Sequence, residues 1–173
     1  MRHPFTFNVV KSVEAILYIA QYVKQPTFHR ISKIMYFADK EHLETYGRFV
    51  CGDHYVAMKH GPVPSNTYDI LKAVRSNGFF ESLDEKAFVV VEQFLVKPLR
   101  AVCIDYFSES DLECLDNAIS KYGAMSFNQL TELSHDQAWQ TADENDYIDI
   151  EHIVATLADP DILLDYLYHF CLE

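Results

Sequence analysis

One carboxylate and three histidines fall close together near the middle of the chain, and these residue types can hold a metal ion or move protons. Asp39 and His42 are spaced to share one face of a helix, and His54 and His60 follow soon after. The HExxH spacing of zinc proteases is missing, and basic residues lie among the candidate ligands. We favour the other interpretation, a polar helix end that contacts the next turn, and expect neither metal nor cofactor.

Cys51 and His54 are a second candidate, because Cys and His together can form a thiol nucleophile. Neighbouring positions on an extended chain point to opposite faces, so sequence neighbours seldom form a catalytic pair. The sequence also contains no GxSxG and no Walker A motif. We therefore expect no enzymatic activity, with a small hydrolase as the weakest alternative.

A buried helix, predicted from Phe28 to Tyr46, must position these residues. Apolar side chains recur at three- and four-residue spacing and aromatic neighbours widen the stripe, as in a helix surrounded by core. The residues concerned are Ile31, Ile34, Met35, Tyr36, Phe37 and Ala38. Gly47 follows as a left-handed stop.

A rigid turn follows that helix. Tyr55–Met58 is predicted to be extended, and in the next segment, Gly61-Pro62-Val63-Pro64, both prolines fix φ and lack an N–H donor. Ser65 is placed to cap a helix that begins at Asn66 and ends at the pair Asn77-Gly78. A stiff turn loses little entropy on contact, so it is either a plain connection or a binding platform.

These segments resemble the signature of the Panacea domain, also described as the SocA-like antitoxin or GepA-like domain. The matching residues are YFAD at positions 36–39 and GD-x-YVAMK-x-GPVPS-x-x-YD at positions 52–69. The resemblance is densest from Lys33 to Lys72 and continues through Leu112–Gly123 and Ser134–Trp139. It implies neutralisation of a toxin in a bacterial or prophage toxin–antitoxin pair, by direct binding or by proteolytic delivery.

His135 and Trp139 add to the resemblance, since a His and a Trp recur near this place in the family. From their chemistry we expect a structural role. Trp139 is predicted to seal the domain at a helix end, with His135 bonded to the main chain.

Length and composition indicate one domain over residues 1–173. The chain is 49% hydrophobic and contains 12 Phe and 11 Tyr, enough to bury a core. Its four cysteines are scattered with no CxxC pair, which favours reduced thiols. The sequence has neither a secretory h-region nor a membrane-length apolar run, so we expect a cytoplasmic protein without a membrane partner.

Charge is unevenly distributed along the chain, whose formal net charge is −12. Residues 1–104 hold 13 Lys and Arg against 10 Asp and Glu, whereas residues 105–173 hold only Lys121 against 16 acidic residues. An acidic half repels phosphate backbones, which argues against direct nucleic-acid binding. It either attracts a basic protein surface or serves solubility, and the sequence leaves both open.

The fold class predicted is α+β: a mainly helical domain with a small antiparallel sheet, an order of elements that also allows a winged-helix comparison. Asn8 caps a first helix over Val9–Val23, and the β-rich segments are Phe88–Val91, Phe94–Val96 and Leu99–Ile104, joined by Tyr55–Met58. Further helices are expected to begin after Ser108, Ser126, Asp149 and Asp159. Their inward residues are predicted to include Leu130, Leu133, Leu163, Leu164, Leu167, Tyr168 and Cys171.

The function expected is that of an antitoxin that binds a cognate protein toxin with a basic face. The alternative is a proteolytic adaptor that delivers the toxin to an ATP-dependent protease. Candidate partner contacts are Asp39, His42, Tyr46, Lys59, Gly61, Pro62, Pro64, Tyr68, Glu109, Glu113, Asp143 and Glu144.

Overall fold

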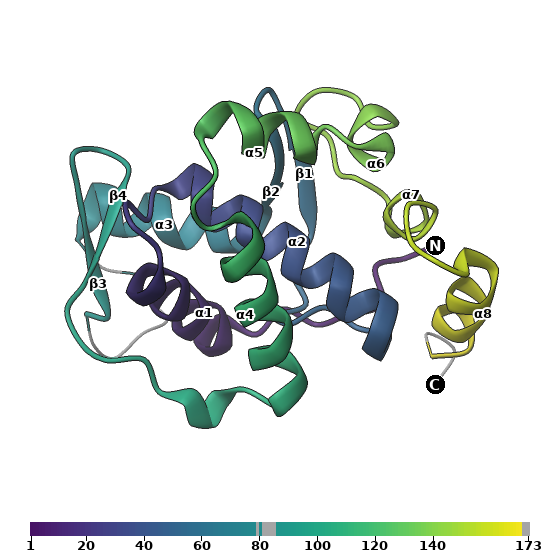
Figure 1. Cartoon of the computed structure of the whole chain (residues 1–173), viewed down its shortest axis with the longest axis horizontal. Coiled ribbons are helices and arrows are strands. Elements are labelled where there is room, and N and C mark those ends of the chain that lie inside the picture. Colours follow the sequence, from purple (N-terminus) through teal and green to yellow (C-terminus); the bar gives the residue numbers. More distant parts are fainter. Residues whose placement is uncertain (79, 81–85, 171–173) are drawn as a thin grey trace.

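The computed structural model describes residues 1–78, 80 and 86–170, without the side chain of Phe170. The chain is mainly helical with two small hairpins (Figure 1), which confirms the predicted α+β class. The elements are α1 (Val9–Tyr22), α2 (Phe28–Tyr46), β1 (Tyr55–Met58), β2 (Gly61–Pro64), α3 (Ser65–Asn77), β3 (Phe88–Val91), β4 (Leu95–Pro98), the 3₁₀-helix η1 (Ile104–Tyr106), α4 (Glu109–Tyr122), α5 (Phe127–Ser134), α6 (Gln137–Gln140), α7 (Ile150–Val154) and α8 (Pro160–Phe170).

Helix α2 is the central element, in contact with α1, α3, α4, α5, α7 and β2. The Thr27 hydroxyl accepts the Arg30 N–H at its start, and Gly47 ends it with a φ of 73°. Apolar residues surround α2 because two cores meet on it. One core lies toward α1, α3 and α4, and the other lies toward β1, α7 and α8. The predicted buried helix is thus confirmed at both ends.

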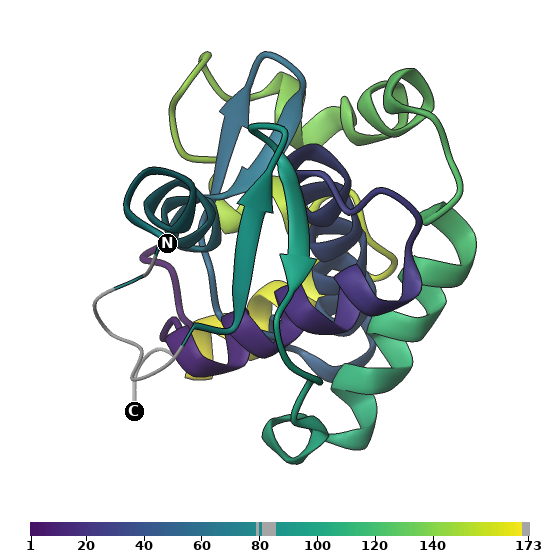
Figure 2. The ribbon, with the colours of Figure 1, turned by 90° about the vertical axis from the view of Figure 1, so that its left-hand side faces the viewer.

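The strands form two separate antiparallel hairpins, β1–β2 and β3–β4 (Figure 2), so the single sheet expected from the sequence is wrong. The segment Gly61–Pro64, predicted as a turn, is strand β2, and Lys59 and His60 make the turn. Pro62 and Pro64 pair with Ala57 and Tyr55. The main-chain groups of Ala57 and Tyr55 point outward and bond to residues 145–148, so at these positions the ladder requires no proline N–H.

The strand predicted over Leu99–Ile104 is also wrong, because β4 ends at Pro98 and η1 follows. Residues 99–104 are held instead by hydrogen bonds to the side chain of Glu14 in α1. Its Oε1 accepts from Arg100 Nη2 at 2.6 Å, and its Oε2 accepts from Cys103 N at 2.7 Å. Bonds to a buried carboxylate replace the ladder that β-branched residues alone suggested.

The N-terminus of α3 has a different cap from the one predicted. The helix already includes Ser65, and the fully buried Asp53 supplies the cap from a distant position. Asp53 Oδ1 accepts from Asn66 N at 3.0 Å, and Oδ2 accepts from Thr67 N and Thr67 Oγ1 at 2.8 and 2.7 Å. One buried carboxylate therefore fixes α3 to the segment ahead of β1.

The later helices follow the predicted starts, with capping boxes at Ser108 and Ser126. Asp149 precedes α7, but its side chain makes no cap hydrogen bond. Leu133 and Tyr168 were predicted to face inward and are 48% and 49% exposed, because α5 and α8 pack through one side only. Cys171 lies outside the described residues. None of the described helices has both the length and the apolar content that a membrane span requires. The winged-helix comparison stays a prediction.

Candidate functional site

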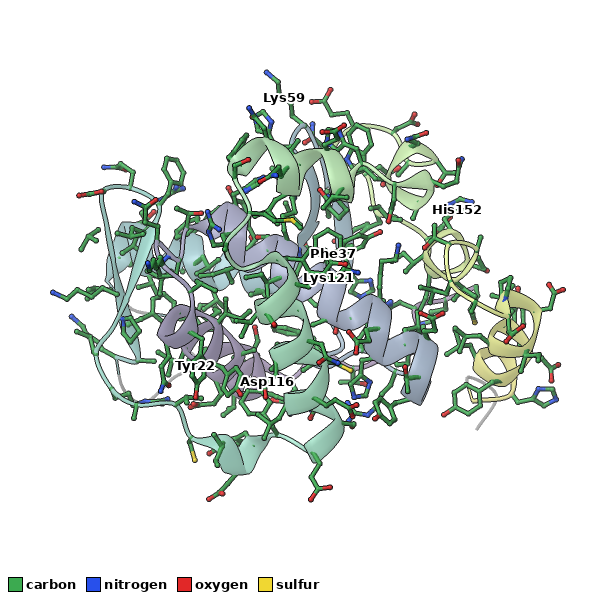
Figure 3. All side chains as sticks on the ribbon, in the orientation of Figure 1. Tyr22, Phe37, Lys59, Asp116, Lys121 and His152 are labelled. Carbon is green, nitrogen blue, oxygen red and sulfur yellow. The ribbon has the colours of Figure 1, made fainter. Side chains whose placement is uncertain are left out.

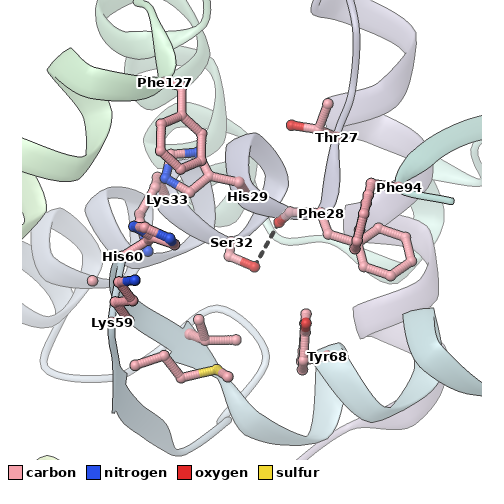
Figure 4. A pocket seen from close by; sticks show the side chains of 13 residues that line it. Thr27, Phe28, His29, Ser32, Lys33, Lys59, His60, Tyr68, Phe94 and Phe127 are labelled. Carbon is pink, nitrogen blue, oxygen red and sulfur yellow. Dashed lines mark hydrogen bonds between the residues drawn. The ribbon is translucent and has the colours of Figure 1, made fainter. Parts of the chain in front are cut away.

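A cavity of about 470 Å³ lies where α2, the β1–β2 hairpin, α3, the β3–β4 turn and α5 meet (Figure 4). One end carries the polar side chains of Lys33, His29 and His60. The other end is formed by the aromatic rings of Phe28, Tyr68 and Phe94. Both a volume of this size and a mostly apolar wall with a few convergent polar groups are typical of ligand sites.

Lys33 is the unusual residue of this wall. It is 1% exposed, and its Nζ donates to the carbonyl oxygen of Pro62 at 2.8 Å. Burial lowers the pKa of Lys33 to about 7. Within the described part of the chain no carboxylate pairs with it, although a buried ammonium group normally requires such a partner.

Gly61 creates the room for Lys33. Its φ is 105°, and a Cβ at this position would lie 2.9 Å from Lys33 Nζ and 2.3 Å from Ser134 Oγ. Neither the backbone conformation nor the space admits a larger residue. The glycine singled out in the sequence thus lets the hairpin backbone approach the lysine.

Two histidines complete the polar end. The His29 ring stacks on Phe127 with centroids 4.0 Å apart, and its Nε2 lies 2.9 Å from Thr131 Oγ1. Burial first, and the nearby Lys33 next, lower the pKa of His29 to about 3. His60, in the hairpin turn, meets the same Phe127 ring edge-on at 5.2 Å. His29 is therefore neutral at physiological pH.

The aromatic end is held by edge-to-face contacts. Phe28 meets Phe94 at 5.7 Å and Tyr68 at 6.0 Å between ring centroids. The guanidinium group of Arg75 lies over both Phe28 and Phe94, at 5.4 and 5.3 Å. These contacts tie α2, α3 and the β3–β4 turn into one wall.

Farther along α2, Asp39 is buried between two donors. Val50 N donates to its Oδ1 and the Tyr55 hydroxyl to its Oδ2, both at 2.6 Å. Burial raises the pKa of Asp39 to about 7, although these hydrogen bonds act in the opposite direction. Asp39 thus ties α2 to Val50 and to β1.

His42 is buried too, one turn farther along, and its ring nitrogens lie 2.9 Å from the carbonyl of Arg48 and 3.0 Å from the hydroxyl of Ser110. It also approaches Asp111, whose carboxylate pairs with Lys11 at 2.5 Å and Arg48 at 3.0 Å. Burial alone would raise the pKa of Asp111, but hydrogen bonds from His42 and Lys11 hold it well below its usual range.

The three histidines of the metal hypothesis lie in three different places. His42 is in the network just described, His54 packs on His3 at 3.9 Å, and His60 lines the cavity. Across residues 1–78, 80 and 86–170 no three His, Cys, Asp or Glu side chains converge to hold a metal. Cys51 is buried, and burial raises its pKa well above the usual value, the reverse of what a nucleophilic thiol requires.

The structure brings some of the candidate contact residues together at the cavity. Gly61, Lys59 and Tyr68 line it, and the carbonyl of Pro62 holds Lys33. Lys59 lies at the hairpin tip and points outward (Figure 3). Pro62 and Pro64 are buried in β2.

Other candidates lie apart from the cavity. Tyr46, 41% exposed at the end of α2, donates to Glu113 Oε2 of α4 at 2.5 Å. Glu109 is exposed at the start of α4, whereas Asp143 and Glu144 are exposed in the loop between α6 and α7. Asp39 and His42 are 2% and 0% exposed, so neither side chain is placed to contact a partner.

Trp139 has the sealing role expected from the sequence. Its ring stacks on His135 at 3.7 Å, and its Nε1 donates to the carbonyl of Met58 at 2.9 Å. Burial and the nearby Lys33 lower the pKa of His135, and a main-chain bond at Lys59 opposes that shift. The pair therefore closes the hairpin from the side of α6.

Sequence reasoning missed the most informative residues of the cavity: Lys33, His29, Phe94 and Phe127. A signal for Lys33 was present, because it lies between Ser32 and Ile34 in a helix assigned to the core. A lysine in a buried stripe requires an explanation that a lysine on a polar face does not. The other three depend on contacts between distant segments.

Comparison with known proteins places the chain in a family. The family model described as "Antitoxin SocA-like, Panacea domain" matches residues 31–140, which confirms the resemblance drawn from the sequence. That range runs from the first turn of α2 through α6 and includes most of the cavity wall. Neither the curated proteins nor the solved structures contain a match.

Proposed function

The chain belongs to the SocA-like Panacea domain family of antitoxins, and we propose that it neutralises a cognate protein toxin by binding it directly. The carrying observation is the family match over residues 31–140, which supports an antitoxin-type role. On this proposal, the bound antitoxin masks the active or target-binding face of the toxin.

The exposed acidic side chains are the proposed contact surface for a toxin with a basic face. Glu109 and Glu113 project from α4, and Asp143 and Glu144 from the loop before α7. Residues 105–173 carry one basic residue against 16 acidic ones, so their field attracts a basic partner and speeds the encounter. Tyr46 lies beside Glu113 and adds an aromatic contact.

A preorganised surface supports binding by masking. The cap from Asp53 fixes α3, two prolines stiffen β2, and main-chain bonds hold residues 145–148 against β1. The loop that carries Asp143 and Glu144 is therefore anchored next to the hairpin. A surface ordered before contact loses little entropy on binding.

We further propose that the chain has no enzymatic activity and acts in the cytoplasm without binding nucleic acid or membrane. The raised pKa of Cys51 supports the first point, because a buried neutral thiol is a poor nucleophile. The acidic half supports the exclusion of nucleic acid.

Co-expression with the product of the adjacent gene tests the function. We expect growth to recover from that product's toxicity and the two purified proteins to co-elute at a defined ratio. Growth that recovers only in cells with an intact ATP-dependent protease, without a stable complex in vitro, would favour the adaptor alternative. Absence of both rescue and complex would contradict the proposal for that partner.

A further inference from the structure

The Lys33 cavity has a chemistry that masking a toxin does not require. At its polar end a buried amine makes, among the described residues, one hydrogen bond, to Pro62 O, while an ammonium group can donate three. The cavity wall in the described residues includes no Asp or Glu. A group that accepts hydrogen bonds and carries negative charge would complement this end.

The remainder of the cavity selects against a purely polar ligand. Phe28, Tyr68 and Phe94 offer ring faces and edges, and Val63 and Met58 add aliphatic surface. Ser32 contributes little polarity, because its hydroxyl donates to the carbonyl of Phe28 at 2.7 Å, as drawn in Figure 4. The ligand must therefore combine one anionic group with an apolar body.

We propose that the Lys33 cavity binds a small organic acid, with one carboxylate at Lys33 and an aromatic or aliphatic body against Phe28, Tyr68 and Phe94. A carboxylate accepts charge-assisted hydrogen bonds from the ammonium group, which are stronger than those between neutral groups. The cavity of about 470 Å³ lies within the range that encloses small ligands.

Proton uptake accompanies this binding. The pKa of Lys33 is about 7 without a carboxylate beside it, and a bound carboxylate raises that pKa. Affinity is therefore full below pH 7 and falls as pH rises above it, by about tenfold between pH 6 and pH 8.

The contributions of the other titratable groups around the cavity must be distinguished from that of Lys33 in such a measurement. They are His29 on the same helix, Lys59 and His60 in the hairpin turn, Tyr68 of α3, and His135 after α5. His29 stays neutral in this range because its pKa is about 3. A His60→Gln variant removes the neighbour in the turn.

The test uses phenylpropionate as the probe and phenylpropanamide, which has the same body without the charge, as its control. The full chain carries a ¹³C-methyl label on methionine, and the Met58 signal reports on the cavity wall. We expect phenylpropionate to shift that signal saturably, more weakly at pH 8 than at pH 6, and the amide to bind at least tenfold more weakly. If a variant fails to fold, the comparison of acid with amide and of pH 6 with pH 8 on wild-type protein still tests the proposal.

Two matched variants assign the effect to Lys33. Lys33→Met should lose at least tenfold in affinity together with the pH dependence, whereas Lys97→Met, the same substitution at an exposed lysine of β4 outside the cavity wall, should keep both. His60→Gln should keep the pH dependence too. Equal binding of acid and amide, or a pH dependence that survives in Lys33→Met, would overturn the proposal.

A peptide that ends in Phe, with its terminal carboxylate free or amidated, separates a small molecule from a chain end. Binding of the free-acid peptide without binding of phenylpropionate would overturn the small-molecule assignment. None of these measurements requires a toxin, so their outcome is independent of the proposed antitoxin function.

Discussion

Helix α2 buries ionisable groups at two places, and the two places differ in how many hydrogen-bonding partners surround the buried group. Toward its C-terminal end, Asp39, His42 and the neighbouring Asp111 meet hydrogen-bonding or ion-pair partners from α1, β1, α4 and the segment after α2. Toward its N-terminal end, Lys33 donates to the carbonyl of Pro62 and faces a cavity, with no other hydrogen bond to the described part of the chain. The first group joins elements together, whereas the second leaves bonding capacity facing a cavity.

The difference indicates two distinct roles for a buried ionisable side chain. Buried carboxylates with several donors join elements of the fold, and removal of one leaves its donors without acceptors. A buried lysine with few acceptors contributes little to the stability of the fold. An apolar residue of similar shape would fill the site without the cost of removing a charge from water. The contrast predicts that the two groups respond differently to substitution.

Gly61→Val should have the largest effect on stability, because the added side chain would overlap the side chains of Lys33 and Ser134. A positive φ and a 2.3 Å approach to Ser134 Oγ combine strain with overlap, which together cost about 4 kcal/mol of unfolding free energy. Urea denaturation measures this cost. The control is Gly78→Ala, at a φ of 75° where the nearest atom would lie at 3.8 Å, with an expected cost of about 1 kcal/mol. Equal stability of Gly61→Val and wild type would contradict the steric role assigned to Gly61.

Asp111→Ala should be next, with a loss of about 3 kcal/mol, because it removes a fully buried carboxylate that pairs with Lys11 and Arg48 and forms half of a capping box. The folded-state pKa of Asp111 is lowered, so its stabilisation is present above about pH 4 and is lost as the pH falls. Wild type and variant should therefore converge in acid. Asp69→Ala, which breaks an exposed pair with Lys72, is the control and should cost less than about 0.5 kcal/mol. Similar losses of stability in Asp111→Ala and Asp69→Ala would show that the buried network contributes no more than an exposed ion pair.

Lys33→Met and Asp39→Asn should alter the pH dependence of stability in opposite directions. The folded-state pKa of Lys33 is lowered to about 7, so below pH 7 the fold carries the full cost of the buried charge. Stability should then rise by about 2 kcal/mol from pH 7 to pH 9 in wild type only. The folded-state pKa of Asp39 is raised to about 7, so wild-type stability should fall from pH 4 to pH 7, and Asp39→Asn should flatten that slope. Thermal melts across pH measure both, and unchanged slopes in either variant would contradict that assignment.

Neutralising exposed carboxylates should have the smallest effect on stability, below about 0.5 kcal/mol. The variant replaces Glu109, Glu113, Asp143 and Glu144 by their amides. Association with the toxin should slow severalfold at low salt and little at high salt, because exposed charges are screened beyond about 8 Å at physiological ionic strength. Stopped-flow measurements at two salt concentrations test this, and equal low-salt rates would leave solubility as the role of these charges.

Elements that depend on local spacing were predictable from the sequence. The first two helices, the stop at Gly47 and the capping boxes at Ser108 and Ser126 follow from neighbours within a turn. The cap of α3 was not predictable in this way, since Asp53 lies far from the helix start in sequence. Strand β2 was misassigned because its two prolines are compatible with a ladder only when their partners bond elsewhere.

The cavity was predictable only in part. Gly61, Lys59 and Tyr68 stood out because their types mark turns and rims. The roles of Lys33 and Phe127 depend on α5 and the hairpin meeting beside α2, a contact between segments far apart in sequence. Periodicity places Lys33 in a buried helix but does not show that a cavity lies beside it.

The segment at residues 145–148 also has a consequence for strand addition. Ala57 and Tyr55 of β1 bond to it through their main-chain groups, and β4 is likewise flanked by residues 26–28, where Phe28 N donates to Phe94 O and Val96 N donates to Pro26 O. An unpaired strand edge is the usual template for aggregation and for partners that extend a sheet. Because irregular chain covers these two edges, another polypeptide cannot add a strand there without displacing it. At β1 and β4, a partner must therefore recognise side chains and shape instead of open main-chain bonds.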